Sequence, residues 1–387
     1  MSSPDAADPK PVEAKRSHDA SLPPVEAPTG AFIMQLFLIP LGIVSIVVLL
    51  WLSFSWLAQA GRSDPKQLIA EIRRGTDVSW QSATNLAEML RSSDPQYDAL
   101  RADPQVVQEL VALVEEDLKH PLKYREGDKT DQQRIERRMF LCWAIGSFTV
   151  ADGAPLLARL ANKEDYPIEV EVRFAALEGL ATLARNVKPA NLRQDKVVMQ
   201  AVIEASRSVD SDSRPQPAEV DSIRAKVSKY SPEYLEKTTY RPHSEVRAVA
   251  AYTLGVLGGD EARQRLTSML SDGYASARYN AATGLCRQGD EAAVKVLKEM
   301  LSPNNEHAVK DERNERAKDR KRAAVLVAGV QGAMTLADAN PEADMEPVIA
   351  ALKELSNASL DHIKTEPNKV KLLATEAYRR LEDRSSK

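Results

Sequence analysis

One short pattern, Val-Arg-x-x-Ala-Ala-x-x-Leu-Gly-x-Leu, recurs along the chain and limits its possible folds more than any other feature. The clearest copy covers residues 246–257, and another covers 277–286. Both copies are followed by Gly-Asp-Glu-Ala, at 259–262 and at 289–292. Self-similarity with a period of about 30 residues is typical of repeat proteins, in which each unit buries its apolar face against its neighbours. The sequence therefore predicts an array of similar units.

The spacing of the apolar positions predicts that each unit is a pair of helices. Positions 1, 5, 6, 9 and 12 of the pattern fall on one helical face, which gives a stripe that must be buried. The two alanines allow a neighbouring helix to approach closely, and the glycine suits the left-handed conformation that ends many helices. The Asp of Gly-Asp-Glu-Ala can accept hydrogen bonds from the free N–H groups of the next helix. Second helices are accordingly expected at 262–270 and 292–301.

The same template fits several other segments less closely. Further copies are found at 78–89, 137–148, 172–183 and 370–381, and a helical run at 322–336 fits loosely. Their second helices are expected at 104–118, 155–160 and 195–206. Aromatic residues make up only 5% of the chain. This favours packed helices over a β-sandwich, whose strands are rich in aromatic and β-branched residues. We therefore predict an all-α architecture.

These residues resemble HEAT repeats, in particular the short HEAT-like repeats of the phycobilisome-lyase type. The resemblance covers most of 76–382 and is most specific over 246–301. It implies a right-handed α-solenoid of helical hairpins with a concave, partner-binding face. Two inserts interrupt the template, at about 208–243 and at 304–321. The first is polar and proline-rich and is either a tolerated surface loop or a functional one. The second carries alternating charges, which predict a solvated helical extension.

The N-terminal part of the chain differs sharply from the repeats. Residues 1–30 are rich in Pro, Ala, Ser and Asp, which predicts a disordered tail. No charged residue occurs between Glu26 and Arg62. A bilayer is crossed by about 20 apolar residues in a helix, so we expect a transmembrane helix at 31–59 and a juxtamembrane linker at 60–75. The protein would then be a single-pass membrane protein.

Two other interpretations of this apolar run are less favoured. A buried core helix would not be expected to be so long, so free of charge and preceded by a disordered tail. A cleaved signal peptide fits Ala58-Gln59-Ala60, but its apolar region is only about 7–15 residues long. Positive charges number three before the run and four after it, which favours a cytoplasmic C-terminal domain. The alanine-rich composition makes a bacterial inner membrane our working expectation for the localisation.

Motifs for chemistry are absent from the sequence. There is no His-Glu-x-x-His, Cys-x-x-Cys, Gly-x-Ser-x-Gly or phosphate-binding loop. The two cysteines, Cys142 and Cys286, occupy inner positions of the template and are expected to be buried. The five histidines show no metal-ligand spacing, and they are His18, His120, His243, His307 and His362. We therefore expect no enzyme, no cofactor and no metal site.

The balance of charged residues limits the class of molecule that the chain can bind. The chain has 52 Lys and Arg against 56 Asp and Glu, a formal net charge of −4, which disfavours a nucleic-acid partner. An arginine recurs at position two of the pattern, as Arg138, Arg173, Arg247 and Arg278. These arginines form either an anion-binding ladder or ion pairs with carboxylates of adjacent units. Recurrence in each unit favours the structural role, because a ligand would touch only some units.

Taken together, these patterns predict a membrane-anchored scaffold or adaptor that binds a protein partner on the concave face of the solenoid. Second-helix side chains are the expected contacts, and they are Arg263, Gln264, Arg265, Lys295 and Lys298. Two alternatives stay open. One is an enzyme-associated HEAT protein of the bilin-lyase type, and the other is a structural subunit of a membrane complex.

Overall fold

The structure is a computed structural model that describes residues 30–60, 64–76, 79–120, 129–162, 170–208, 242–312 and 314–385. The chain divides into two compact units, 1–63 and 64–387, and each is considered by itself. Every regular element in the described residues is a helix, so no strand occurs among them. The predicted all-α class is confirmed for this part of the chain.

The described part of the first unit is one helix, α1 (Gly30–Ala60), which contains Pro40. Apolar side chains along its length are exposed, for example Phe37, Leu49 and Trp51. The predicted tail at 1–30 lies outside the described residues except for Gly30.

The predicted membrane anchor requires a correction. Over the described residues, no helix combines the length and the apolar character that crossing a bilayer takes. This finding overturns the transmembrane helix at 31–59. The bacterial inner-membrane localisation and the orientation that depended on this helix are overturned with it.

The second unit consists of helical hairpins in two layers. The first helices form one layer, and they are α3 (Ser79–Arg91), α6 (Lys129–Gly146), α8 (Val170–Val187), α13 (Pro242–Leu257), α15 (Ala275–Arg287) and α17 (Glu315–Ala339). The second helices form the other layer, and they are α5 (Pro104–Lys119), α7 (Ala154–Ala161), α10 (Lys196–Ser206), α14 (Asp260–Met269), α16 (Val294–Leu301) and α18 (Glu346–Asn357). Helix α2 (Pro65–Arg74) packs on α3 at one end, and α19 (Pro367–Ser385) packs on α17 and α18 at the other.

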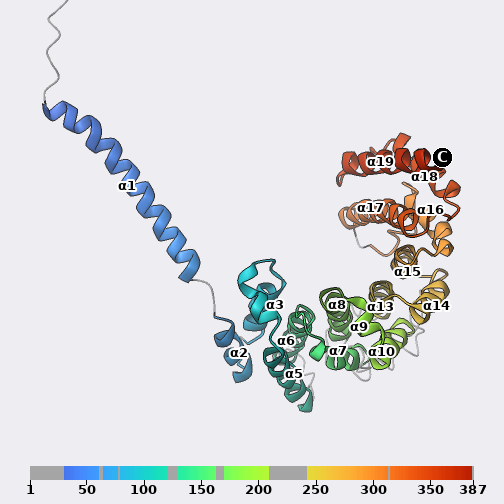
Figure 1. Ribbon diagram of the computed structural model, residues 1–387, viewed down its shortest axis with the longest axis horizontal. Coiled ribbons are helices and arrows are strands. Elements are labelled where there is room, and N and C mark those ends of the chain that lie inside the picture. Colours follow the sequence, from blue (N-terminus) through green and yellow to red (C-terminus); the bar gives the residue numbers. More distant parts are fainter. Residues whose placement is uncertain are drawn as a thin grey trace, which may run out of the picture. The chain divides into compact units, whose positions relative to one another are not determined.

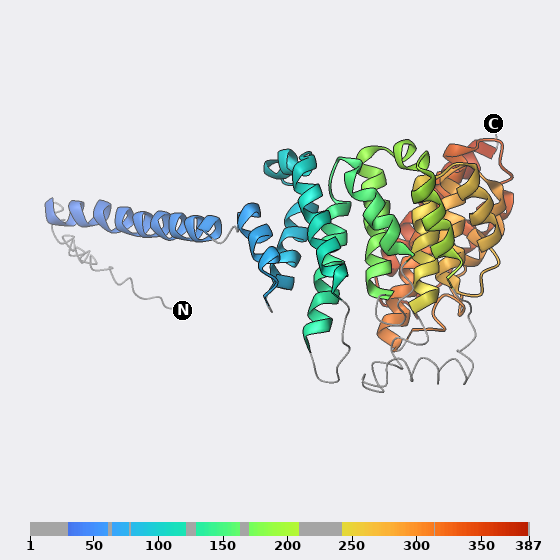
Figure 2. The ribbon, with the colours of Figure 1, turned by 90° about the horizontal axis from the view of Figure 1, so that it is seen from below.

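Consecutive hairpins are held together mainly through the first layer. Helix α6 packs between α3 and α8, and α13 packs between α8 and α15. Within the second unit, the first helices line the inner side of the arc in Figure 1 and the second helices its outer side. Seen from below, the helices stand side by side (Figure 2). Short helices complete the connections, and they are η1 (Pro95–Tyr97), α4 (Asp98–Arg101), η2 (Ala151–Gly153), α9 (Pro189–Arg193) and η3 (Glu291–Ala293).

Small residues of the pattern lie where first helices cross. The paired alanines at 250–251 and 281–282 are fully buried, as expected. Gly255 of α13 faces Gly284 of α15, and a Cβ on Gly255 would lie 2.6 Å from the Gly284 Cα. Gly146 of α6 and Gly179 of α8 repeat this arrangement. The pattern glycine therefore lies where two first helices cross, because only a residue without a Cβ lets their backbones approach this closely.

The left-handed turn that we expected at the pattern glycine occurs slightly later in the chain. Gly258 and Gly259 have φ of 65° and 91°, and Gly289 has φ of 68°. Asp290 then accepts a hydrogen bond from Ala292 N at 3.0 Å, as predicted for the start of a second helix. Asp260 makes no such cap, because Gly259 is the N-cap residue of α14.

The basic residue at position two of the pattern joins each hairpin to the one before it. In five copies it donates a hydrogen bond to a carbonyl group at or just after the C-terminal end of the preceding second helix. The bonds join Arg138 Nη2 to Asp117 O (3.2 Å), Arg173 Nε to Ala161 O (2.9 Å), Arg247 Nη1 to Ser208 O (3.5 Å), Arg278 Nη1 to Asp272 O (2.6 Å) and Lys371 Nζ to Ala358 O (3.4 Å). Positive charge is favourable there, because the last carbonyls of a helix lack partners and carry partial negative charge.

Three of these arginines also form ion pairs. Arg138 Nε lies 2.6 Å from Asp117 Oδ2, Arg247 binds both oxygens of Asp272 at 2.8 and 3.0 Å, and Arg278 Nη2 lies 2.6 Å from Glu299 Oε1. Only the Arg138 pair crosses to the preceding hairpin, since Asp272 and Glu299 belong to the same hairpin as their arginines. These contacts agree with a structural role for the arginines. The predicted pairing with carboxylates of adjacent units holds for Arg138, whereas Arg247 and Arg278 pair within their own hairpins.

The segments predicted between the repeats have the following structure. Helix α2 lies within the predicted linker at 60–75, and it buries Leu68, Ile69 and Ile72. In the predicted insert at 304–321, residues 304–312 form turns that bury Val309, and α17 begins at Glu315. The predicted insert at 208–243 lies outside the described residues except for Ser208, Pro242 and His243.

Candidate partner-binding groove

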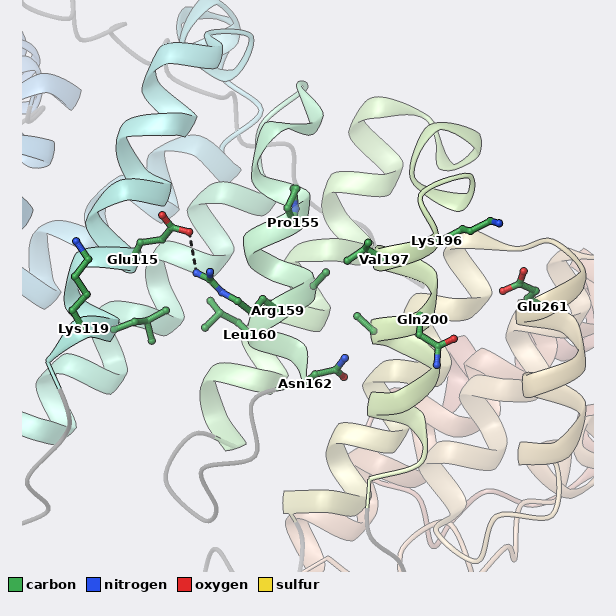
Figure 3. A pocket seen from close by; sticks show the side chains of 13 residues that line it. Glu115, Lys119, Pro155, Arg159, Leu160, Asn162, Lys196, Val197, Gln200 and Glu261 are labelled. Atoms are coloured by element: carbon green, nitrogen blue, oxygen red, sulfur yellow. Dashed lines mark hydrogen bonds and ion pairs between the residues drawn. The ribbon is translucent and has the colours of Figure 1, made fainter.

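A groove of about 1470 Å³ runs across the second-helix layer. Helices α5, α7 and α10 line it, and Glu261 of α14 lies at its end (Figure 3). The groove crosses three hairpins, so the stacking of the hairpins creates it. In Figure 1 these helices lie on the outer side of the second unit.

The apolar part of the groove is an apolar strip in which Pro155 and Val197 are exposed, whereas Ala158, Leu160 and Ala201 are buried. It consists of Leu118, Pro155, Ala158, Leu160, Val197 and Ala201. Val197 is 66% exposed. Among the described residues of the second unit, Val197 and Leu372 are the large apolar side chains with this degree of exposure. Single exposed apolar residues are common on proteins, but one that lies within a groove is typical of a binding site.

The way in which α10 begins explains why Val197 points toward the solvent. Asp195 caps the helix by accepting hydrogen bonds from Val197 N at 2.9 Å and Val198 N at 3.3 Å. Val198 and Met199 face the core, whereas Val197 and Gln200 lie on the exposed face. The N-cap therefore sets the rotation of the helix, and this rotation presents a valine to the solvent.

Charged side chains of both signs surround the apolar strip. Glu115 Oε1 accepts from Arg159 Nη2 at 3.0 Å, and Figure 3 shows this pair at one side of the groove. Both partners are about half exposed, so the pair contributes little to stability and can exchange for contacts with a ligand. Lys119 pairs with Glu116, and the hydrogen bond that Lys119 donates to the Glu116 carboxylate raises the pKa of Lys119. Lys196 and Glu261 lie toward the other end.

The five predicted contact residues lie on α14 and α16, in the same layer as the groove but not within its lining. Arg263, Gln264, Lys295 and Lys298 are exposed. Arg265 is half-buried and serves a structural purpose, because it donates to Ser206 Oγ at 2.6 Å and to Ser206 O at 2.7 Å. These residues therefore lie in the layer on the outer side of the arc, whereas the partner-binding face was expected on its concave, inner side.

Sequence analysis did not identify the groove residues. The repeat pattern marks the residues that are buried, whereas a groove depends on how neighbouring second helices are spaced. One signal was present, because Val197 occupies a position of α10 whose helical neighbours Gln200 and Glu204 are polar and exposed.

Chemistry that depends on metals or thiols has little support in the described part of the chain. No group of three or more His, Cys, Asp or Glu side chains is placed to hold a metal ion there. Cys142 and Cys286 are both fully buried, as expected. Burial raises the pKa of the Cys286 thiol to about 12.

We expect both thiols to be inert in the folded protein, because the thiolate is the reactive form and burial disfavours it. At pH 8, dithionitrobenzoate should release no thionitrobenzoate from the native chain within an hour. After unfolding in guanidinium chloride, absorbance at 412 nm should report both thiols. A thiol of the native protein that reacts as fast as free cysteine would contradict the buried placement.

A comparison with protein families agrees with the helical architecture. The family described as HEAT repeats matches residues 232–314. One solved structure to which the chain is similar is human deoxyhypusine hydroxylase in complex with glycerol, at 17% identity and a TM-score of 0.22. The alignment covers 78% of this chain and 98% of the hydroxylase. No curated protein matches the sequence. The family match supports a helical repeat scaffold and does not distinguish the phycobilisome-lyase type.

The prediction that the chain is not an enzyme requires a correction. The similar solved structure is by its name a hydroxylase, and at a TM-score of 0.22 this likeness establishes no activity for this chain, so whether it is an enzyme is unconfirmed. The missing motifs exclude only the particular mechanisms to which those motifs belong.

Proposed function

We propose that the second unit is a scaffold that binds a protein partner and that the groove on the second-helix layer holds a segment of this partner. The observation that carries the proposal is Val197, a large apolar side chain that is 66% exposed within a groove lined by three hairpins. An exposed apolar side chain inside a groove supports a binding site, because ligand sites are concave and mostly apolar.

The groove suggests the chemistry of the segment. An apolar strip favours one or two apolar side chains, and flanking charges of both signs favour a segment of mixed charge. Glu115, Lys119 and Lys196 are exposed along the groove and supply these charges. Such a strip with a polar rim fits a short amphipathic segment, which anchors itself through a few apolar residues.

The residues predicted from the sequence extend this proposal. We propose that Arg263 and Gln264 contact the partner where it passes Glu261 at the end of the groove. Lys295 and Lys298 lie one hairpin further along the same layer and would be reached only by a longer partner. Arg265 is already bound to Ser206, so its replacement should affect folding more than binding.

Replacing Val197 with aspartate should weaken the binding of the partner. The substitution removes apolar contact and places a charge against an apolar strip, which together correspond to a loss of about ten- to hundredfold in affinity. A photo-crosslinking residue at position 197 of the full chain, expressed in its own host, should capture one predominant protein. Isothermal titration with that purified protein should then give a Kd that Val197→Asp raises by this factor.

Leu372→Asp is the matched control, because Leu372 is also large, apolar and highly exposed, at 58%, but lies on α19. A crosslinker at 372 should capture a different set of proteins, and Leu372→Asp should leave the Kd unchanged. Equal capture at both positions, or equal loss of affinity in both variants, would refute the groove as the binding site.

A further inference from the structure

A second pocket, of about 410 Å³, lies on the opposite layer of the second unit. Its lining comes from α13, α15 and α17, together with Met300 of α16. In Figure 1 these first helices line the inner side of the arc. The pocket shares no residue with the groove on the second-helix layer, so the inference below does not depend on the function proposed for that groove.

The charged side chains that line this pocket are all positive. It contains Arg287 and Lys321 together with hydroxyl and amide side chains, and it contains no aspartate or glutamate. The polar members are Tyr252, Ser276, Tyr279, Asn280, Thr283, Gln331 and Thr335. The pocket is therefore positively charged, although the chain as a whole has more acidic than basic residues.

A third cation adjoins the pocket through Tyr252. Arg185 of α8 donates from Nη1 to the Tyr252 hydroxyl at 2.9 Å. The Arg287 guanidinium lies over the Tyr252 ring, 5.6 Å from its centre. One tyrosine of α13 thus holds two guanidinium groups, from the hairpin before it and from the hairpin after it.

These three cations lack anionic partners within the described part of the chain. Lys321 donates to the neutral Ser276 hydroxyl at 2.8 Å, and Arg185 binds neutral oxygens of Tyr252 and Thr182. The nearby carboxylate of Glu299 is engaged elsewhere, because it accepts from Arg278 at 2.6 Å and from Tyr279 at 2.7 Å. Elsewhere in the unit, position-two arginines such as Arg138, Arg247 and Arg278 are paired with carboxylates.

We infer that this pocket binds an acidic segment of a protein, whose carboxylates pair with Arg185, Arg287 and Lys321. Two guanidinium groups suit carboxylates because each can donate two parallel hydrogen bonds. The amide and hydroxyl groups of Gln331, Thr335 and Thr283 lie beside them and can bind the backbone of the segment. The segment would lie across α8, α13, α15 and α17, along the inner side of the hairpins.

The test uses the full chain and a fluorescein-labelled peptide of ten glutamates, with a peptide of ten glutamines as the uncharged probe. Fluorescence anisotropy at about 50 mM salt should show saturable binding of the glutamate peptide only, and binding should weaken at about 500 mM salt. The triple variant Arg185→Gln, Arg287→Gln, Lys321→Gln should bind about tenfold more weakly or worse, as expected for three lost ion pairs.

The control removes the same charge elsewhere on the unit, in the triple variant Lys66→Gln, Lys353→Gln, Arg379→Gln. All three of these side chains are exposed and lie outside the pocket. This variant should bind within twofold of the original chain. Equal weakening in both triple variants, equal binding of the glutamine peptide, or tighter binding of an RNA oligonucleotide than of the glutamate peptide would overturn the inference.

Discussion

Replacing Asp117 with alanine should destabilise the second unit by about 3–5 kcal/mol, because it would leave buried guanidinium groups without their anion. Asp117 is 8% exposed at the end of α5. Its Oδ2 lies 2.6 Å from Arg138 Nε, and its Oδ1 lies 3.1 Å from Arg134 Nε and also binds Arg137. Circular dichroism at 222 nm during guanidinium unfolding should show the loss as a lower transition midpoint.

Glu116→Ala is the matched control, because Glu116 is the preceding carboxylate on the same helix. Glu116 pairs with Lys119, and both side chains are more than half exposed. This variant should leave the unfolding midpoint unchanged within error. If the two variants lost stability equally, helix propensity at the end of α5 would explain the effect, and the buried ion pairs would not.

The contribution of Asp117 should depend on pH in a defined direction. Burial alone would raise the pKa of its carboxyl group, but the guanidinium groups of Arg138 and Arg137 and the hydrogen bond from Arg134 outweigh burial and hold it below 3.8. A lowered pKa in the folded state stabilises the protein above the unfolded-state pKa, and this stabilisation is lost as pH falls through the folded-state pKa. The stability gap between the original chain and Asp117→Ala should therefore be constant from pH 7 to about 5 and narrow below about pH 4.

The repeat pattern predicted the hairpins and the structural use of their arginines because both depend on local, recurring geometry. A buried position recurs in every copy, so its physical requirement can be inferred from the residue types that occupy it. Lys371 illustrates this point, since it replaces the arginine in the last copy and still donates to the end of the preceding helix. Arg173 keeps the same contact, since its Nε donates to the Ala161 carbonyl, and its Nη2 also donates to the Ser208 hydroxyl.

The candidate sites could not be predicted in the same way. Both lie between hairpins, where the distance between neighbouring helices determines what is exposed. The groove around Val197 joins α5, α7 and α10, which are separated in sequence by first helices. The inner pocket depends on Tyr252, which joins Arg185 to Arg287 across three hairpins. Nothing in a single copy of the pattern encodes such contacts.

The pattern glycine shows how tertiary packing changes the meaning of a residue. Its place near the end of a first helix suggested a left-handed cap, which is a local explanation. The structure places Gly255 within α13 against Gly284, and Gly258 and Gly259 have the left-handed conformation instead. A local rule could not separate these roles, because both require a residue without a Cβ.

Replacing Gly284 with valine should destabilise the second unit by about 3 kcal/mol, because there is no space for a side chain where α13 and α15 cross. A Cβ at this position would lie 2.8 Å from the Gly255 Cα and 3.0 Å from Leu266 Cδ1. The first contact is with backbone, so the helices themselves would have to separate. Thermal unfolding of the full chain should show this as a clear decrease in Tm.

Gly332→Ala and Gly284→Ala together distinguish crowding from helix propensity. Alanine stabilises a helix interior by up to about 1 kcal/mol relative to glycine, and this gain applies at both positions. At Gly332 the nearest atom to a new Cβ is Leu297 Cδ2 at 2.8 Å, the end of a flexible side chain that can move. Gly332→Ala should therefore be neutral or stabilising, whereas Gly284→Ala should be destabilising despite the same gain. If both were stabilising, the close crossing of α13 and α15 would not require glycine.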